Sequence, residues 1–142
     1  RGDVDPAEAL ADGRAMDKWR EMVAGQGGDP DAALPAAQHT EVIAAEASGY
    51  VTAMDALSIG VASWRLGAGR ARKEDAVQAE AGIEIHAKPG EAVTKGQPLL
   101  TLHTQTPERI ERAREALSGA IAIGPERRGG ADSVVLGRVD PQ

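Results

Sequence analysis

The chain has 142 residues, a formal net charge of −6 and no cysteine. This length accommodates one domain with a core, or a small domain plus an appendage. The lack of cysteine excludes disulfides, thiolate metal sites and cysteine nucleophiles. The acidic balance argues against nucleic-acid binding, and no apolar run is long enough to span a membrane. We therefore expect a soluble cytoplasmic protein with neither nucleic-acid nor membrane partners.

The first 39 residues predict one helix and a linker. Asp5 as N-cap, Pro6 at the first helical position and Glu8 three residues after the cap are typical of a helix start. Apolar residues then recur at helical spacing through residue 24. The chain begins directly before this helix and without Met, which suggests a piece of something longer. Residues 29–39 hold two prolines and no clear period, as expected of a linker.

From residue 40 the sequence pattern changes from helical to strand-like. Residues 40–47 and 50–54 predict two strands joined by a turn at Ser48-Gly49. Asp55 is placed to cap a helix that runs to about Leu66. A glycine inside a helix costs up to about 1 kcal/mol relative to alanine. Gly60 is therefore best explained if another part of the protein packs closely against the helix there.

Shorter elements follow in the last third of the chain. Strands are predicted at 82–87, 99–104 and 120–123, and a helix opens at Thr106-Pro107 and ends near Ser118-Gly119. Residues 134–139 are either an edge strand or disordered. The order of elements predicts an α+β fold, because a doubly wound parallel sheet would need more long crossovers.

No catalytic constellation is visible in the sequence. The chain has three histidines, of which His86 and His103 lie in predicted strands and are expected near each other, while His39 lies in the linker. They lack HxH or HExxH spacing, so we expect ordinary surface or half-buried histidines. GxSxG, GxGxxG and GxxxxGK[ST] are absent. We therefore assign no catalytic, substrate-binding or metal-binding residue and no cofactor.

The stretch GAGRARKED (67–75) offers a phosphate-loop reading and a structural one. Phosphate loops place their glycines before a helix, where the N–H groups face the anion. Here the glycines follow a predicted helix, at its negative end. Gly67 is then expected to end the helix with positive φ, and Gly69 to let the chain turn again. The basic residues complement the helix end and Glu74 and Asp75, or are solvated; they are Arg65, Arg70, Arg72 and Lys73.

The segment AGIEIHAKPGEAVTKGQPLLTLHT alternates short apolar runs with turns. It resembles the barrel scaffold of biotinyl and lipoyl carrier domains, in which a stretch like Gly90-x-x-Val93-x-Lys95-Gly96-Gln97 is common. Such carriers need a lysine at a hairpin tip. The Ser48-Gly49 turn has no lysine, and Lys88 and Lys95 lie in other turns. The resemblance therefore concerns the scaffold and not the carrier function.

A second resemblance covers about 110 residues in order. The pieces ALADGRAMDKWREMVAGQGGD (9–29) and ASGYVTAMDALSIGVASWRLGAGRARKEDAVQAEAGIEIHAKPGEAVTKGQPLLTLHT (47–104) are similar to the C-terminal part of thymidine phosphorylase and related pyrimidine-nucleoside phosphorylases. This resemblance implies the last helix of the large α/β body in residues 1–39, an α/β-hammerhead (barrel-sandwich-like) domain in 40–124, and a polar tail in 125–142.

The same resemblance implies reversible phosphorolysis of thymidine or deoxyuridine to a free base and deoxyribose 1-phosphate. It implies a full-length homodimer that binds phosphate and a pyrimidine nucleoside. The family's Lys-His-Ser phosphate segment and its Arg…Ser-x-x-x-Lys base-binding helix are absent, so no catalytic residue carries over and the isolated chain is expected to be inactive. A standalone carrier and a free-standing interaction module remain the alternatives. The preference for thymidine or uridine is not readable from these residues.

Overall fold

The computed structural model describes residues 4–70 and 72–128, and the chain divides into two compact units, Arg1–Leu34 and Pro35–Gln142. The predicted strand at 134–139 lies outside the described residues. Within these residues, no helix is both long and apolar enough to cross a membrane.

The first unit contains two helices where the sequence predicts one. Helix α1 spans Pro6–Ala11 and α2 spans Arg14–Gly25. Asp5 caps α1 as predicted, and its Oδ1 accepts the Ala7 N–H at 2.8 Å. The prediction of a continuous helix is wrong because Gly13 has φ 89° and Asp12 accepts the Arg14 N–H at 3.1 Å, which together start a new helix.

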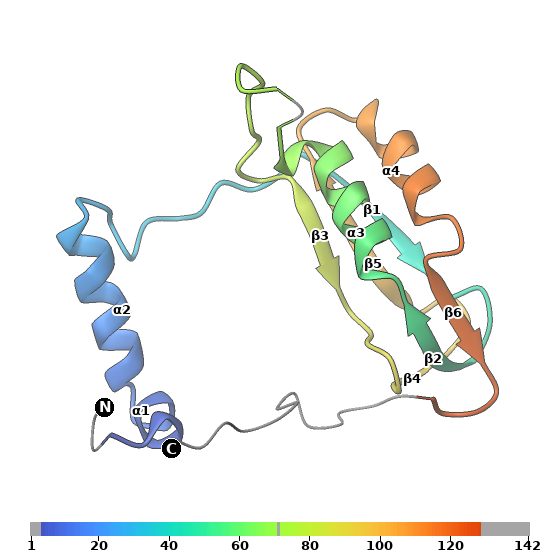
Figure 1. The fold of residues 1–142 in the computed structure, drawn as a ribbon, viewed down its shortest axis with the longest axis horizontal. Helices are drawn as coiled ribbons and strands as arrows, with labels where there is room; N and C mark the ends of the chain where they lie inside the picture. The colour runs from blue at the N-terminus through green and yellow to red at the C-terminus, as the bar shows by residue number, and fades with distance from the viewer. Residues whose placement is uncertain (1–3, 71, 129–142) are drawn as a thin grey trace, which may run out of the picture. The chain divides into compact units, whose positions relative to one another are not determined.

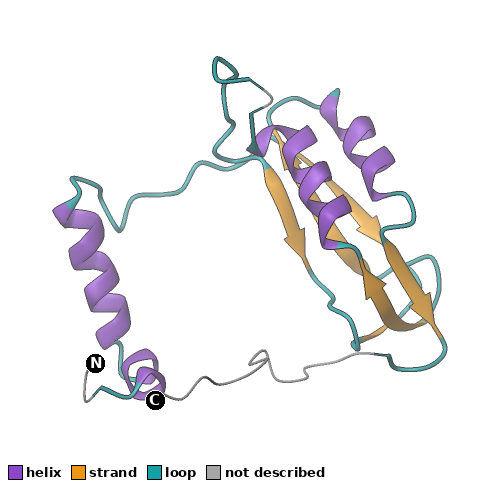
Figure 2. Ribbon diagram, in the orientation of Figure 1, coloured by secondary structure: helices purple, strands orange, loops and turns teal. Residues whose placement is uncertain are grey.

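The second unit is a mixed α+β domain with two small antiparallel sheets, drawn in Figures 1 and 2. Its strands are β1 (His39–Ala44), β2 (Gly49–Met54), β3 (Gly82–Ile85), β4 (Ala92–Val93), β5 (Pro98–Thr104) and β6 (Ile121–Gly124). Its helices are α3 (Ala56–Ser63), extended by a π-type turn over Trp64–Ala68, and α4 (Arg109–Leu117). The α+β prediction is therefore confirmed.

The two sheets divide strands that are neighbours in sequence. One sheet has the order β1-β5-β3 and the other β4-β2-β6. The chain passes from one sheet to the other at Ser48-Gly49, so β1 and β2 do not pair with each other. A Cβ at Gly49 would lie 2.5 Å from the Gly124 carbonyl oxygen. Glycine at this position allows β6 to approach the start of β2.

Two groups of aliphatic side chains form the core. Between the sheets lie Ala45, Val51, Ala87, Val93, Leu99 and Leu100. Between the helices and the β1-β5-β3 sheet lie Ala62, Leu66, Leu102 and Ala113. Strand β5 contributes to both groups and is the most buried strand, consistent with its central position in its sheet. The small side chains allow close approach of α3 and α4, which lie side by side (Figure 1).

Helix α3 begins as the sequence predicts and differs in its middle. Asp55 accepts the backbone N–H groups of Leu57 (3.2 Å) and Ser58 (3.1 Å). The Ser58 hydroxyl also donates to Asp55. This bond is the largest cause of the lowered pKa of the Asp55 carboxyl, and the two backbone N–H bonds lower that pKa further. No atom lies within 4 Å of the place where a Cβ at Gly60 would stand. Within the described residues, the close packing expected at Gly60 is therefore absent.

Candidate functional site

The GAGRARKED loop lies after α3, at the helix end that the sequence predicts. Gly67 has φ 119°, as expected of a residue that ends a helix, and its carbonyl oxygen accepts the Gln78 N–H at 2.9 Å. The predicted end at Leu66 is nearly correct, since the helix finishes in the π-type turn over Trp64–Ala68. These glycines do not precede a helix and cannot present N–H groups to a phosphate in the way a phosphate loop does.

Gly69 has a different role from the one expected. Its backbone is extended (φ −140°, ψ 173°) and therefore needs no glycine for conformational reasons. A Cβ at Gly69 would lie only 2.7 Å from Cδ1 of Trp64. The chain bends at Gly69 as predicted, but the reason for glycine here is the room it leaves for the indole ring.

The basic residues of this region fall into two groups. Arg65 donates from Nη1 to the Arg112 carbonyl oxygen (2.6 Å) and lies 3.5 Å from the Glu115 carboxylate, so it ties the end of α3 to α4. Arg70 makes only a long contact of 3.5 Å with the Lys73 carbonyl oxygen. Among the described residues, neither Arg70 nor Lys73 forms an ion pair. Arg70 and Lys73 are therefore solvated, which is one of the two roles expected for the basic residues of this loop.

A pocket of about 380 Å³ opens beside this loop. We call it the arginine pocket, defined by Trp64, Arg65, Asp75, Arg109 and Arg112. Three guanidinium groups and one carboxylate give it an excess of positive charge. The Asp75 carboxylate accepts the Arg72 N–H at 2.8 Å. The buried Arg65 Nε has no hydrogen-bond partner among the described residues.

Gln78 connects the far end of the loop to the corner between β5 and α4. Its Nε2 donates to Thr106 Oγ1 (2.7 Å), and its Oε1 accepts the Gln105 N–H (2.9 Å). The Gln105 Nε2 donates to the Glu80 carboxylate at 2.7 Å. The pKa of Glu80 is lowered, chiefly by its own backbone N–H and then by Gln105. These polar groups bind one another, so the arrangement fixes the chain and has no free base for catalysis.

The two strand histidines both lie beside Glu84 and not against each other, because His103 is paired with Gly82 while the His86 N–H bonds the Leu99 carbonyl. The Glu84 carboxylate lies 3.9 Å from Nδ1 of His86 and 3.8 Å from Nε2 of His103. His86 Nε2 is also 2.7 Å from the Thr101 hydroxyl. The prediction that His39 lies in the linker is wrong, because its pairing with Thr104 makes it the first residue of β1, away from this group. Within residues 4–70 and 72–128, no three His, Asp or Glu side chains are arranged to hold a metal ion.

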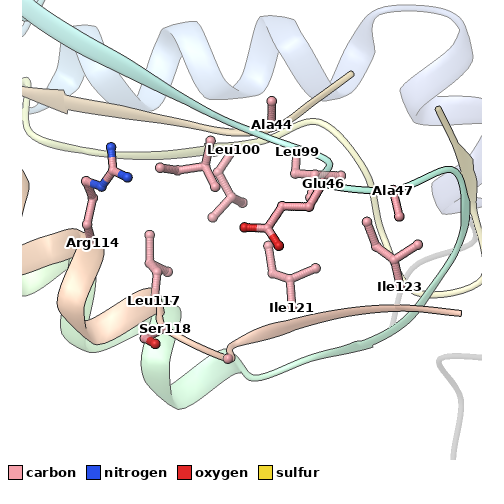
Figure 3. Close-up of a pocket in the computed structure, with 12 residues that line it drawn as sticks. Ala44, Glu46, Ala47, Leu99, Leu100, Arg114, Leu117, Ser118, Ile121 and Ile123 are labelled. Atoms are coloured by element: carbon pink, nitrogen blue, oxygen red, sulfur yellow. The ribbon is translucent and has the colours of Figure 1, made fainter. Parts of the chain in front are cut away.

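A larger groove, of about 520 Å³, lies where the two sheets meet the end of α4. Figure 3 shows its aliphatic walls, which include Leu99, Leu100, Leu117 and Ile121. The Glu46 carboxylate points into it, and Arg114 lines one end. Arg114 bonds Glu41 at 2.7 Å, and this contact raises the pKa of the guanidinium. Most of the residues that line the groove are apolar, so it is suited to packing against another apolar surface.

Neither turn lysine is displayed as a carrier lysine would be. Lys88 lies in the turn before β4, where its N–H donates to Glu91 at 2.9 Å. Lys95 lies in the turn between β4 and β5, and its N–H donates to Ser48 Oγ at 2.9 Å. The two turns are held by these contacts and differ from a hairpin that presents a lysine at its tip.

Sequence comparison identifies the family of the chain, which the geometry of these sites does not. Residues 50–124 match the family described as pyrimidine nucleoside phosphorylase C-terminal domain. The chain belongs to this family. It is 50% identical over 119 residues to a thymidine phosphorylase of Mycobacterium tuberculosis, which covers 84% of the chain and 28% of the relative. It is 38% identical over 133 residues to a pyrimidine-nucleoside phosphorylase of Staphylococcus epidermidis, covering 90% of the chain and 30% of the relative.

The matched family describes one domain and not a whole enzyme. The chain spans less than a third of the length of the curated relatives it matches. The match over residues 50–124 includes the GAGRARKED loop, the histidine pair and both turn lysines. The matched region thus contains the features that most resemble ligand sites in the sequence.

Proposed function

We propose that this chain is the C-terminal structural domain of a thymidine (pyrimidine-nucleoside) phosphorylase. The complete enzyme would reversibly convert thymidine or deoxyuridine and phosphate into a free base and deoxyribose 1-phosphate. The observation that carries the proposal is the 50% identity to a thymidine phosphorylase over 84% of the chain. The domain would have the α/β-hammerhead fold, a proposal that its mixed α+β architecture with two small antiparallel sheets supports.

The proposal assigns a role to each part of the chain. Residues 1–39 would be the end of the large α/β body plus a linker, 40–124 the hammerhead domain, and 125–142 a polar tail. The exposed apolar side chains of α1 and α2 support this division, because Leu10, Trp19 and Met22 are 75%, 45% and 51% exposed and need a partner. The complete enzyme would be a cytoplasmic homodimer that needs no cofactor.

The chain by itself would not catalyse phosphorolysis. The reaction needs a phosphate held in line with the sugar and a stabilised leaving base. In this proposal Glu84, His86 and His103 have no role in binding phosphate, and the loop arginines serve packing or are solvated. We therefore assign no catalytic or substrate-binding residue to this chain.

The test compares two proteins in the same thymidine phosphorolysis assay. The purified 142-residue chain should release no thymine in the presence of phosphate, whereas the complete polypeptide should. Thymine release by the chain alone would refute the inactive role, and an inactive complete polypeptide would refute the enzyme assignment. Mass spectrometry of the chain for biotin or lipoate tests the carrier alternative, for which we expect no added mass.

A further inference from the structure

One face of α3 is left uncovered by the described residues of its unit. We define the α3 outer face by Leu57, Gly60 and Trp64, which follow one another at helical spacing of three and four residues. Leu57 is 74% exposed and Trp64 is 41% exposed. The opposite side of the helix buries Ala62 and the following Leu66 completely. Helix α3 therefore uses only one of its sides within this unit.

The sequence of α3 is unsuited to a solvent-facing side. Residues Ala56–Ser63 read ALSIGVAS and contain no charged side chain. A surface helix normally carries charged residues on its outer face, and a helix that is apolar on all sides is normally buried. Helix α4 shows the ordinary pattern, since its exposed positions are charged, at Glu111, Arg112 and Glu115. The difference between the uncharged α3 and the charged outer face of α4 indicates that both sides of α3 are covered in the complete polypeptide.

Gly60 lies at the middle of the uncovered face. Its φ is not positive, and a Cβ there would meet nothing within 4 Å. Neither backbone conformation nor packing within the described residues requires glycine, while its helix propensity is poor. A backbone that approaches α3 closely at this point is the remaining physical reason for a glycine.

The arginine pocket continues this face at the C-terminal end of α3, because Trp64 belongs to both. In the described residues, neither Arg109 nor Arg112 forms an ion pair. A carboxylate placed in the pocket would form charge-assisted hydrogen bonds with these two guanidinium groups.

We propose that the α3 outer face and the arginine pocket form one docking surface for the segment of the same polypeptide that precedes residue 1. That segment would lay an apolar surface against Leu57 and Gly60 and insert a carboxylate among Arg65, Arg109 and Arg112. The inference rests on the proposed function, in which this chain is one part of a longer enzyme.

The choice of occupant follows from the lengths of the relatives. The chain accounts for 28% of the M. tuberculosis thymidine phosphorylase and 30% of the S. epidermidis relative. Most of such a polypeptide is therefore available to cover this domain, permanently and at high effective concentration. Because the pocket carries an excess of positive charge, the residues of that segment that enter it would be acidic.

Cysteine labelling tests the docking surface directly. Leu57→Cys is introduced into the 142-residue chain, which has no other cysteine, and into the complete polypeptide. Maleimide labelling of that cysteine is followed by peptide mass spectrometry. We expect labelling to slow about ten-fold or more in the complete polypeptide, because the site opens only rarely. Glu111→Cys, at an exposed position of α4 outside the surface, is the control and should label equally fast in both.

A charge variant tests the pocket. Arg112→Ala in the complete polypeptide should increase the labelling rate of Leu57→Cys, while Lys95→Ala, which removes a positive charge from a distant turn, should not. Raising the salt concentration should act in the same direction as Arg112→Ala, because it screens the contact. An unchanged rate with Arg112→Ala would exclude a carboxylate in the pocket.

Gly60 provides a test with opposite signs in the two proteins. Gly60→Ala should raise the melting temperature of the 142-residue chain by about 3 °C, because alanine is the better helix former. In the complete polypeptide the same change should lower the melting temperature. Stabilisation in both proteins would show that no backbone approaches Gly60.

Other occupants give distinct results. Protection of Leu57→Cys in dilute 142-residue chain would mean that the chain covers its own α3, and protection that grows with concentration would mean a second copy. Either result overturns the proposal, as does equal labelling in both proteins. Thymidine phosphorolysis is measured on the same samples. An active polypeptide without protection contradicts only this inference, and a protected but inactive one contradicts only the proposed function.

Discussion

The hydroxyl of Thr104, the last residue of β5, donates a hydrogen bond to the carbonyl oxygen of Leu66, 2.7 Å away. Thr104 is fully buried, and the bond joins residues 38 positions apart in the sequence. The carbonyl belongs to the π-type turn that ends α3, where helical backbone groups lack their usual partners. One side chain thus links the central strand to the helix end and satisfies a backbone group there.

Removing this hydroxyl should destabilise the domain. Thr104→Val keeps the shape but leaves the Leu66 carbonyl buried without this donor, which costs about 1 to 3 kcal/mol. Urea unfolding followed by circular dichroism measures the loss. Thr104→Ser retains the hydroxyl and should recover most of the hydrogen-bond contribution. If the valine variant were as stable as the original protein, the bond would contribute nothing net.

Gly49 should not tolerate a side chain. Gly49→Ala places a Cβ 2.5 Å from the Gly124 carbonyl oxygen at a φ of 155°. We expect a loss of more than about 2 kcal/mol in the free energy of unfolding, since β2 and β6 must separate or the backbone must shift. Thermal unfolding is the measurement.

The matched control for that change is Gly82→Ala, in β3. A Cβ at Gly82 would meet nothing within 4 Å, and its φ is not positive. This variant should unfold at nearly the original temperature. Equal effects at the two positions would mean that the close approach between β2 and β6 is not what Gly49 provides.

The cap of α3 should make stability depend on pH. Because the folded-state pKa of Asp55 lies below its ordinary value, the cap's contribution is present at neutral pH. It is lost in acid, as the pH falls through the lowered folded-state value and the carboxyl takes up a proton. Asp55→Asn still caps the helix but does not titrate. The difference in melting temperature between the original protein and Asp55→Asn should therefore shrink on acidification.

A second acid variant separates the cap from general acid destabilisation. Glu74→Gln removes a carboxylate from an exposed turn and should show the same acid profile as the original protein. A pH-independent difference between the original protein and Asp55→Asn would contradict the role of the charged cap.

The loop arginines should not matter for phosphate. In the complete polypeptide, Arg70→Ala with Arg72→Ala should leave the phosphate KM nearly unchanged, because the glycines of this loop follow α3 and its negative end. Steady-state phosphorolysis at varied phosphate measures this. A large rise in the phosphate KM without loss of stability would restore the phosphate-loop interpretation.

Local chemistry was readable from the sequence. Asp5 and Asp55 cap helices as predicted, and Gly67 has the positive φ expected after a helix. The strands were found because alternating apolar residues and turn residues act over a few positions. The family resemblance, spread over about 110 residues in order, was confirmed by the match of residues 50–124.

The break at Gly13 and the division of β1 and β2 between two sheets needed the tertiary structure. The bend at Gly69 is predictable from the sequence, whereas the Trp64 indole that excludes a side chain there is not. These features depend on contacts between separate segments or, at Gly13, on a local choice between continuing and breaking the helix. The spacing of apolar residues does not reveal either. The sequence by itself determined the helix caps, the α+β class and the family. Only the tertiary structure decided which strands pair, which arginines share a pocket and which side of α3 is left uncovered, because distant segments set those contacts.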